Sequence, residues 1–360
     1  MTDTTTSQGE QLVEPALAAL PRMLLPSDLF CYEVVEGEPG LRGESVRYTM
    51  MVLLGLLRAG QAGLSLPIDP HRLRDGVDAA LERPEMTPGD LGLRLWVESR
   101  ADTGAAERLV GALDESLRSH GGLAAREGQE LAWIVTGLAL TADADERGRT
   151  LLAGALDQLI NVNQAPSGLF RHFGGPGFRR RFPNFATEIY SVLALAVAAR
   201  RELDDRALPA ARRAADRLLE LQLPDGGWPW LFEAERGAVV ERYEVYSVHQ
   251  AGMAPMALLE LSEVSGDARY ASAARRGVPW LFGANELGQD MVPLDRGMTY
   301  RSIRRRRPLD RLWLYANTAL AARLDRRLGG GGRILEVNRT CRPYELGWLV
   351  EAWADAAGAG

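Results

Sequence analysis

The sequence predicts an all-α protein that folds as a closed (α/α)6-type barrel of helical hairpins. The first observation is a seven-residue phrase that occurs twice, at 164–170 (QAPSGLF) and 222–228 (QLPDGGW), so that the copies start 58 residues apart. Each copy follows a helical pattern and precedes a long loop, and a partial third copy stands at 26–30 (PSDLF). Repeats of this length are typical of stacked supersecondary units, and about six hairpins would nearly fill the chain.

The second observation is that helical patterns of two kinds alternate along the chain. Amphipathic patterns with a face rich in Arg and Glu, as expected of outer helices, occur at 9–23, 70–82, 104–119, 146–163, 207–222 and 268–283. More apolar patterns, as expected of inner helices, occur at 44–59, 88–99, 128–141, 185–202, 243–262, 310–326 and 343–355. We therefore expect one toroid domain over residues 1–360, with residues 1–8 disordered.

Composition agrees with one sizeable globular body. With 46% hydrophobic and 25% charged residues, the chain can bury a substantial core. A net charge of −6 without a basic stripe argues against a nucleic-acid partner. The sequence contains no lysine, so all 42 Lys and Arg residues are arginines, and Schiff-base chemistry through lysine is excluded. The planar guanidinium of arginine suits carboxylate or phosphate groups.

Cysteine usage and the absence of targeting signals limit the remaining classes. Cys31 and Cys341 are too few for a disulfide framework and wrongly spaced for a zinc knuckle, so we expect no metal and no cofactor. The polar stretch 1–10 does not resemble a signal peptide, and no apolar run is long enough for a membrane span. A cytoplasmic location follows as the default expectation, and the oligomeric state is not predicted.

The lengths of the connections indicate which end of the barrel carries the site. Turns from inner to outer helices are short, whereas several outer-to-inner loops are long, and long loops on a rigid scaffold usually carry function. The loop 166–185 contains Arg171 and His172, and the loop 287–310 contains Arg301 and Arg304. Each cluster alone is typical of a solvated loop. Two such clusters at one end of the barrel favour an anionic substrate, since the positive dipole ends of the inner-helix N-termini add to the positive charge of the arginines.

The densest group of candidate catalytic residues is 241–256 (ERYEVYSVHQAGMAPM). Helical spacing would place one set of its side chains on a single stripe: Tyr246, His249, Gln250 and Met253. Pro255 should loosen the turn before it. An imidazole at His249 with Tyr246 or Glu244 as its counterpart could supply acid and base chemistry near neutral pH. The alternative is that His249 is a hydrogen-bonded core residue.

Further ligand contacts are expected at the same end. Trp230 could stack on a sugar ring, whereas Trp228 is expected to be structural because the other copy of the phrase has phenylalanine there. Arg342 and Tyr344 stand where the last inner helix should begin, and Asp225 lies in the repeated phrase. We expect Arg301 and Arg342 to hold the anionic group of the ligand.

The stretch 218–228, with Gln222, Gly226, Gly227 and Trp228, resembles the QW repeat of squalene and terpene cyclases and protein prenyltransferases. Similar phrases occur in α/α-toroid polysaccharide lyases, so the resemblance, over residues 150–350, implies the toroid more than its chemistry. Class II terpene cyclases also use a DxDD acid motif. The nearest string here, 143–146 (DADE), departs at its last position and falls at the opposite end of the expected barrel.

Two further resemblances limit the chemistry. N-acylglucosamine 2-epimerase-like barrels are similar in architecture and use histidines for proton transfer, and here His172 and His249 lie at the expected active end. Lanthionine cyclases share the toroid but bind zinc through Cys and His, in a sequence context that this chain lacks. Converging polar groups fit a hydroxyl-rich acidic ligand better than a carbocation.

The sequence therefore predicts a carbohydrate-active lyase, epimerase or hydrolase that acts on an acidic sugar or glycan. Two alternatives stay open at this point. One is a class II-like terpene or prenyl-diphosphate cyclase, and the other is a non-catalytic toroid that binds a glycan or protein.

Overall fold

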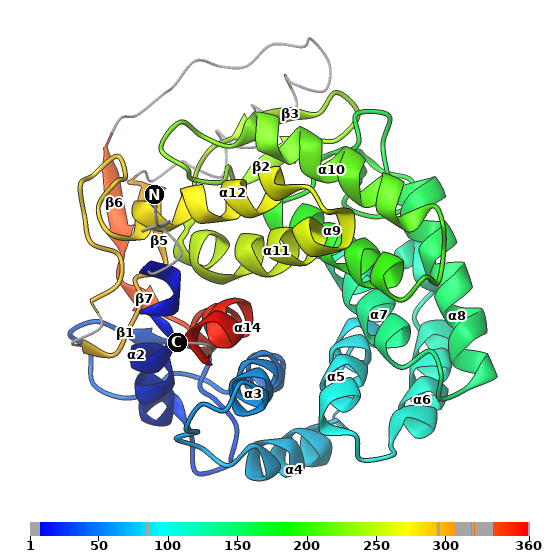
Figure 1. The fold of residues 1–360 in the computed structure, drawn as a ribbon, viewed down its shortest axis with the longest axis horizontal. Helices are drawn as coiled ribbons and strands as arrows, with labels where there is room; N and C mark the ends of the chain where they lie inside the picture. The colour runs from blue at the N-terminus through cyan, green and yellow to red at the C-terminus, as the bar shows by residue number, and fades with distance from the viewer. Residues whose placement is uncertain are drawn as a thin grey trace.

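The computed structural model describes residues 8–81, 83, 86–293, 296–306, 318, 320 and 334–358. Within this part of the chain, helices form two concentric layers (Figure 1). The inner layer contains α3 (Val46–Gln61), α5 (Pro88–Ala101), α7 (Gly128–Leu140), α9 (Phe185–Arg200), α11 (Ala254–Ser265) and α14 (Pro343–Gly358). The outer layer contains α2 (Val13–Ala19), α4 (Pro70–Ala80), α6 (Ala106–Ser119), α8 (Glu146–Asp157), α10 (Ala207–Leu221) and α12 (Ala268–Gly277). The predicted toroid of helical hairpins is confirmed.

Single tight or wide helical turns complete the layers. The 3-10 turns are η1 (Leu20–Met23), η2 (Leu123–Ala125), η4 (Phe178–Arg181) and η6 (Val278–Leu281), and the π-turns are η3 (Gln158–Asn163) and η5 (His249–Met253). None of the described helices is long and apolar enough to cross a membrane. The inner helix predicted at 310–326 falls almost wholly outside the described residues, as do residues 1–7 of the expected disordered start. Residue 8 lies in a helical turn.

The inner layer closes because its last helix packs against its first. Neighbouring inner helices contact one another around the ring, and α14 contacts both α3 and η5 (Figure 1). The contact between α3 and α14 requires glycine, since a Cβ on Gly55 would lie 2.4 Å from the carbonyl oxygen of Gly347. The same holds between α5 and α7, where a Cβ on Gly137 would lie 2.3 Å from the carbonyl oxygen of Gly92. Larger residues would push these helices apart.

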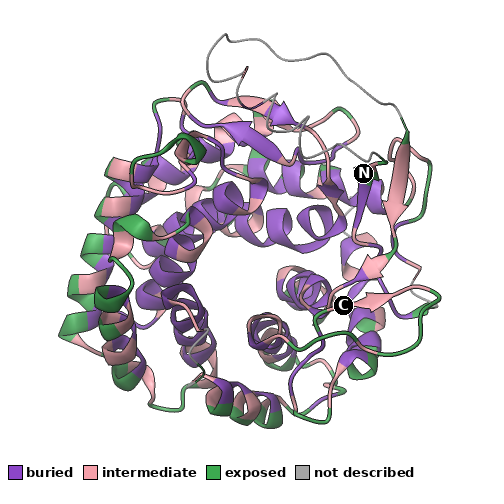
Figure 2. Ribbon diagram, turned by 180° about the vertical axis from the view of Figure 1, so that it is seen from behind, coloured by how far each residue is buried: buried purple, intermediate pink, exposed green. Residues whose placement is uncertain are grey.

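Burial follows the two helix types recognised in the sequence. Figure 2 shows the inner helices as almost continuously buried, whereas the outer helices expose their outward faces. In α9 the residues from Thr187 to Ala198 are all buried, as its nearly unbroken run of apolar residues requires. In α10 buried alanines occupy one face and arginines the other, the usual pattern of a helix with one solvated side.

The repeated phrase acts as a structural clamp between hairpins. In the first copy, the Gln164 amide donates to the carbonyl oxygens of Gly168 and Ala210, each at 2.9 Å, and its oxygen accepts from Arg213. The second copy repeats this pattern, because the Gln222 amide donates within its own loop and to the next outer helix, α12. The phrase therefore joins each loop to the following outer helix.

The partial third copy has the same backbone geometry with different residues. Leu25 N–H donates to the carbonyl oxygen of Leu29 at 2.9 Å, as Ala165 and Leu223 do in their own loops. Asp28 adopts a φ of 56°, where the other copies have glycine. Aspartate is one of the few residues that tolerate this left-handed conformation. The three copies are therefore one loop design.

The strands lie in the long loops near the inner-helix N-termini. They form three small antiparallel sheets: β1 (Val34–Val35) with β7 (Thr340–Cys341), β2 (Leu231–Glu233) with β3 (Ala238–Glu241), and β4 (Val245–Tyr246), β5 (Ser302–Arg305) and β6 (Leu335–Asn338) in that order. The prediction that the inner helix begins at residue 243 was wrong. Tyr246 pairs with Ser302 in the sheet, so it does not share a helical stripe with His249.

We expect Gln164→Ala to destabilise the fold by about 1–3 kcal/mol, because the substitution leaves the buried carbonyl groups of Gly168 and Ala210 without their donor. Urea unfolding followed by circular dichroism measures the change. Gln61→Ala, on an exposed glutamine at the end of α3, is the control and should have little effect. Equal stability of the two variants would contradict the clamp.

Candidate functional site

A cavity of about 190 Å3 opens among the N-terminal ends of the inner helices. We call it the mouth cavity. Its polar and aromatic lining residues are Arg47, Tyr48, Gln129, Trp133, Asn184, Tyr190, Trp230, Tyr246, His249, Arg301, Arg342 and Tyr344, and its apolar ones include Met51 and Met253. The volume is below the range of about 300–1,000 Å3 that is typical of drug-sized ligands. It suits a single small ring better than an extended chain.

Three arginines line the mouth cavity, and contacts with other side chains hold each of them in place. Arg47 makes a bidentate ion pair with Asp90, with Nε and Nη2 at 2.6 and 3.0 Å from the carboxylate oxygens. Arg342 donates to the Tyr48 hydroxyl at 2.8 Å, and its guanidinium lies 4.2 Å from the ring centre of Tyr32. These contacts fix the orientation of both guanidinium groups.

Arg301 is the most enclosed of the three. Its Nη1 donates to Glu345 at 2.8 Å and lies 3.4 Å from the Tyr344 hydroxyl, and its guanidinium lies 4.8 Å from the ring centre of Tyr246. The Glu345 carboxyl is 1% exposed, and burial raises its pKa to about 7 against the opposing effect of Arg301 and Arg342. Arg301 is therefore charged beside a carboxyl whose charge depends on pH.

These arginines stand at the positive ends of the inner helices, so their charge adds to the helix dipoles. The side-chain caps Ser45, Thr87 and Asn184 start α3, α5 and α9 at this end. The positive ends of these helices and the three guanidinium groups thus lie at the same end of the barrel. Such an arrangement favours an anion in the mouth cavity.

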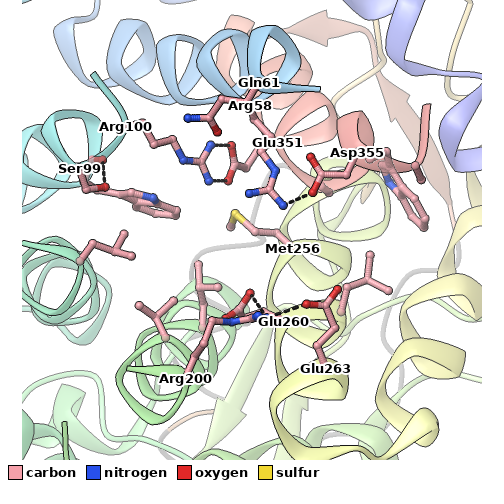
Figure 3. A pocket seen from close by; sticks show the side chains of 18 of the residues that line it. Arg58, Gln61, Ser99, Arg100, Arg200, Met256, Glu260, Glu263, Glu351 and Asp355 are labelled. Carbon is pink, nitrogen blue, oxygen red and sulfur yellow. Dashed lines mark hydrogen bonds and ion pairs between the residues drawn. The ribbon is translucent and has the colours of Figure 1, made fainter. Parts of the chain in front are cut away.

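The opposite end of the barrel contains a larger cavity of about 610 Å3 with balanced charges. Figure 3 shows its ion pairs: Arg100 with Glu351, Arg58 with Asp355, and Arg200 with Glu260 and Glu263. These arginines lie in the last turns of α3, α5 and α9, where they offset the negative helix ends. The acids of these pairs line the same cavity as the arginines, whereas no described Asp or Glu lines the mouth cavity, so we place the candidate site at the mouth cavity.

An aromatic layer separates the two cavities. Trp348 is fully buried between Trp96, at a centroid distance of 5.3 Å, and Tyr190, at 6.1 Å. Tyr190 also meets Trp133 edge to face at 5.4 Å. Trp96 lines the larger cavity at the opposite end of the barrel, whereas Trp133 and Tyr190 line the mouth cavity. The ring is therefore closed across its middle by side chains.

The local helix geometry sets the position of His249. Pro255 has no N–H, so the carbonyl of Ala251 loses its usual helical partner, and it accepts from the Trp353 indole at 2.8 Å instead. The preceding turn widens into the π-turn η5, which begins at His249. The expectation that Pro255 loosens this turn is confirmed. Such π-turns occur frequently at functional sites.

His249 is packed among aromatic rings. Its ring lies 4.5 Å from that of Phe185 and 5.0 Å from that of Tyr246, and it is nearly parallel to Trp230 at 6.3 Å. Its Nδ1 is buried and has no hydrogen-bond partner among the described residues. Burial, with the nearby charge of Arg301, lowers the pKa of His249 to about 3. The His249 imidazole is therefore neutral at physiological pH.

The phenols of the mouth cavity are also neutral. Burial raises the pKa of Tyr48, Tyr190, Tyr246 and Tyr344 above the ordinary value. Among the described residues, no Asp or Glu lines the mouth cavity. Within the same part of the chain, no group of three His, Cys, Asp or Glu is placed to hold a metal ion.

The structure brings half of the sequence-predicted site residues together and separates the rest. The mouth cavity is lined by His249, Tyr246, Trp230, Arg301, Arg342 and Tyr344. The other predicted residues do not line it: Glu244, Gln250, Arg304, Asp225, Arg171 and His172.

The partners of the second group explain its position. Glu244 accepts from Ser302, and the fully buried Gln250 donates to the Tyr246 carbonyl. Asp225 and Arg304 pair with Arg242 and Glu336, and Arg171 pairs with Glu235. His172 is buried with Nε2 3.4 Å from Glu127. Trp228 is fully buried against Phe185, as expected of a structural residue.

Sequence reasoning missed several lining residues: Arg47, Tyr48, Gln129, Trp133, Asn184 and Tyr190. Arg47 and Tyr48 stand at the start of a predicted inner helix, the same position that identified Arg342. Applying that rule to each inner helix would have found them. Trp133 and Tyr190 lie deeper in their helices, and only packing shows that they face the cavity.

The low pKa of His249 predicts a specific pH dependence of stability. The ordinary pKa of histidine is 6.5, and the pKa of His249 in the folded state is about 3. At pH values between these two, the unfolded state binds a proton at this residue and the folded state does not. His249 therefore destabilises the fold as the pH falls, by up to about 1.4 kcal/mol per pH unit. Urea unfolding between about pH 7 and 5 should show a smaller loss for His249→Gln than for wild type. His71→Gln, on an exposed histidine of α4, is the control. Parallel curves for wild type and His249→Gln would show that His249 titrates normally.

Comparison with known proteins identifies the fold. No protein-family model matches the chain, and no curated protein is similar to it in sequence. A sugar epimerase from a ruminal bacterium superposes with a TM-score of 0.62 at 12% identity, covering 96% of this chain and 98% of that one. An unsaturated glucuronyl hydrolase specific for heparin superposes with a TM-score of 0.63 at 13% identity, with 97% of each chain covered.

Cellobiose 2-epimerase from Bacillus thermoamylovorans gives a TM-score of 0.63 at 9% identity, covering 99% of this chain and 100% of that one. At such identities the likeness shows the fold alone. These structures give no support to the resemblance to terpene cyclases. The chain thus has the α/α-toroid fold that is also found in sugar epimerases and glucuronyl hydrolases.

Proposed function

We propose that this protein is a carbohydrate-active enzyme that binds an acidic sugar in the mouth cavity and catalyses a proton transfer on it. The observation that carries the proposal is the set of three arginines at the positive ends of the inner helices: Arg47, Arg301 and Arg342. Asp90 and Glu345 pair with Arg47 and Arg301, but no described Asp or Glu lines the cavity itself, where the positive helix ends add to the positive charge. An anionic ligand would supply a negative group on the cavity side.

The rest of the lining supports a sugar as the ligand. Trp230 offers a ring on which a sugar can stack, while Gln129 and Asn184 offer amide groups for hydroxyls. The volume of about 190 Å3 favours one sugar residue or the end of a chain. Fold neighbours named as epimerases and as a glucuronyl hydrolase add support by analogy.

The reaction class that the lining supports best begins with removal of a proton beside the sugar carboxylate. An arginine such as Arg301 would neutralise the carboxylate and make the adjacent C–H more acidic. The neutral imidazole of His249 would accept the proton, and the Tyr246 phenol would donate one. Epimerisation returns a proton to the carbon, whereas β-elimination expels the leaving group. Hydrolysis by paired carboxylates has less support, because no described lining residue is a carboxylate.

The ligand itself would make His249 a better base. In the empty cavity the charge of Arg301 contributes to the low pKa of the imidazole. A carboxylate bound to Arg301 would offset that charge and raise the pKa of His249. The low pKa in the empty cavity also favours the second candidate, a non-catalytic toroid that only binds an anionic glycan.

Binding and turnover assays separate these candidates. Uronates such as D-glucuronate and uronate-ended oligosaccharides should raise the melting temperature, because they bind the folded state, and D-glucose should do so less. Incubation with the same panel, read by mass spectrometry and proton exchange from solvent, tests for turnover. Stabilisation without chemistry would favour the binding protein, and stabilisation by farnesyl diphosphate alone would overturn the proposal.

We expect His249→Ala to lower turnover by roughly 10²–10⁴-fold, the usual contribution of a general acid or base. Steady-state kinetics on the best substrate of the panel measure this loss. His172→Ala removes a buried histidine that does not line the mouth cavity and should keep its turnover. A His249→Ala variant that melts lower but keeps wild-type turnover would show that His249 is only a core residue.

Arg342→Ala should chiefly weaken binding. Loss of charge-assisted hydrogen bonds typically costs about 1.5–3 kcal/mol, or roughly ten- to a hundredfold in affinity. The weaker binding should appear as a higher KM and a higher dissociation constant, with a smaller change in kcat. Arg304→Ala, on a half-exposed strand arginine paired with Glu336, is the matched control. Equal effects of the two substitutions would remove Arg342 from the site.

A further inference from the structure

Glu345 lies behind the mouth cavity and contacts two of its arginines. It stands in the first turn of α14, is 1% exposed and does not line the cavity. One carboxyl oxygen accepts from Arg301 Nη1 at 2.8 Å, and the other lies 3.5 Å from the backbone N–H of Arg342. Glu345 is therefore the carboxyl group that both orients Arg301 and balances its charge.

We propose that Glu345 is a positioning residue that controls how much of the charge of Arg301 is available, so that an anionic ligand binds together with one proton taken up by Glu345. The inference rests on the proposed function in one respect, the anionic ligand. It assigns a role to a residue that does not touch the substrate.

The geometry explains why ligand and proton should bind together. Among the described residues, the Arg301 guanidinium also contacts the neutral Tyr344 hydroxyl and Tyr246 ring, and its ion-pair partner is the buried Glu345. A ligand carboxylate on the cavity side would place a second negative charge on the same guanidinium, a few ångströms from the first. Proton uptake by Glu345 removes this repulsion, and its carbonyl oxygen can still accept from Arg301.

The groups around this pair keep their charge state near neutral pH. Burial raises the pKa of Tyr344 on α14, of Tyr48 on α3, of Tyr246 on β4 and of the Cys341 thiol on β7, so all four stay protonated. The pKa of His249 is lowered to about 3, so it stays neutral in the empty cavity. Arg342, with Glu33 at 3.7 Å, is the other charged neighbour.

Glu345 differs from these groups because its pKa is raised to about 7. A ligand that favours protonated Glu345 raises that pKa further. Its affinity is therefore highest below about pH 7, where Glu345 already carries the proton, and falls by up to about tenfold per pH unit above it. This direction is the reverse of what a site requiring an ionised Glu345 would show.

Isothermal titration of the full chain with D-glucuronate over about pH 5.5–8.5 tests the inference. We expect wild type to take up a fraction of a proton near neutral pH, measured by comparing buffers of different ionisation enthalpy. Glu345→Gln keeps an acceptor for Arg301 and should bind with a pH-independent affinity and no linked proton. Glu351→Gln is the matched control: Glu351 is buried on the same helix and paired with Arg100, but it lines the opposite cavity.

The outcomes separate the inference from the proposed function. Glucuronate binding with no linked proton in wild type, a measurement that needs no variant to fold, would overturn the role of Glu345 and leave the proposed function standing. A pH dependence that persists in Glu345→Gln or disappears in Glu351→Gln would also overturn it. Failure of glucuronate and the other uronates to bind at any pH would overturn both.

Discussion

The close contact between the first and last inner helices is the constraint on which the candidate site depends. Gly55 and Gly347 let α3 and α14 approach until a Cβ would meet the facing backbone. This contact places Tyr48 beside Arg342, two residues that are 294 positions apart in the chain. A wider contact would separate the two halves of the lining, so ring closure and site assembly are one packing event.

Electrostatics then distinguishes the two ends of the same ring. Among the described inner helices, α3, α7, α9 and α14 contribute residues near their N-termini to the mouth cavity, and α3, α5 and α9 contribute their last turns to the opposite one. At the C-terminal end, Arg58, Arg100 and Arg200 offset the negative helix ends and pair with acids. At the N-terminal end, Arg47 pairs with Asp90, and Arg301 pairs with Glu345, whose pKa is about 7, but no described Asp or Glu lines the cavity. This difference in lining is why we propose an anionic ligand for the smaller cavity.

The repeated phrase illustrates the difference between a fold signal and a function signal. Gln164 and Gln222 make the same hydrogen bonds, one to their own loop and one to the next outer helix. Asp28 reproduces the left-handed turn without the glutamine. The two full copies therefore have a structural role, and a resemblance based on the phrase indicates the toroid fold without indicating the chemistry.

Periodicity and repeat length predicted the toroid and the two helix types, because each is a property of local sequence. They also identified His249 and Arg342, which stand at helix starts. Tertiary structure alone decided the rest. Tyr246 lies in a strand because it pairs with Ser302, and Arg171 forms an ion pair with Glu235. The physical reason is that partners far apart in the chain decide which side chains are neutralised and which remain available, and periodicity contains no information about partners.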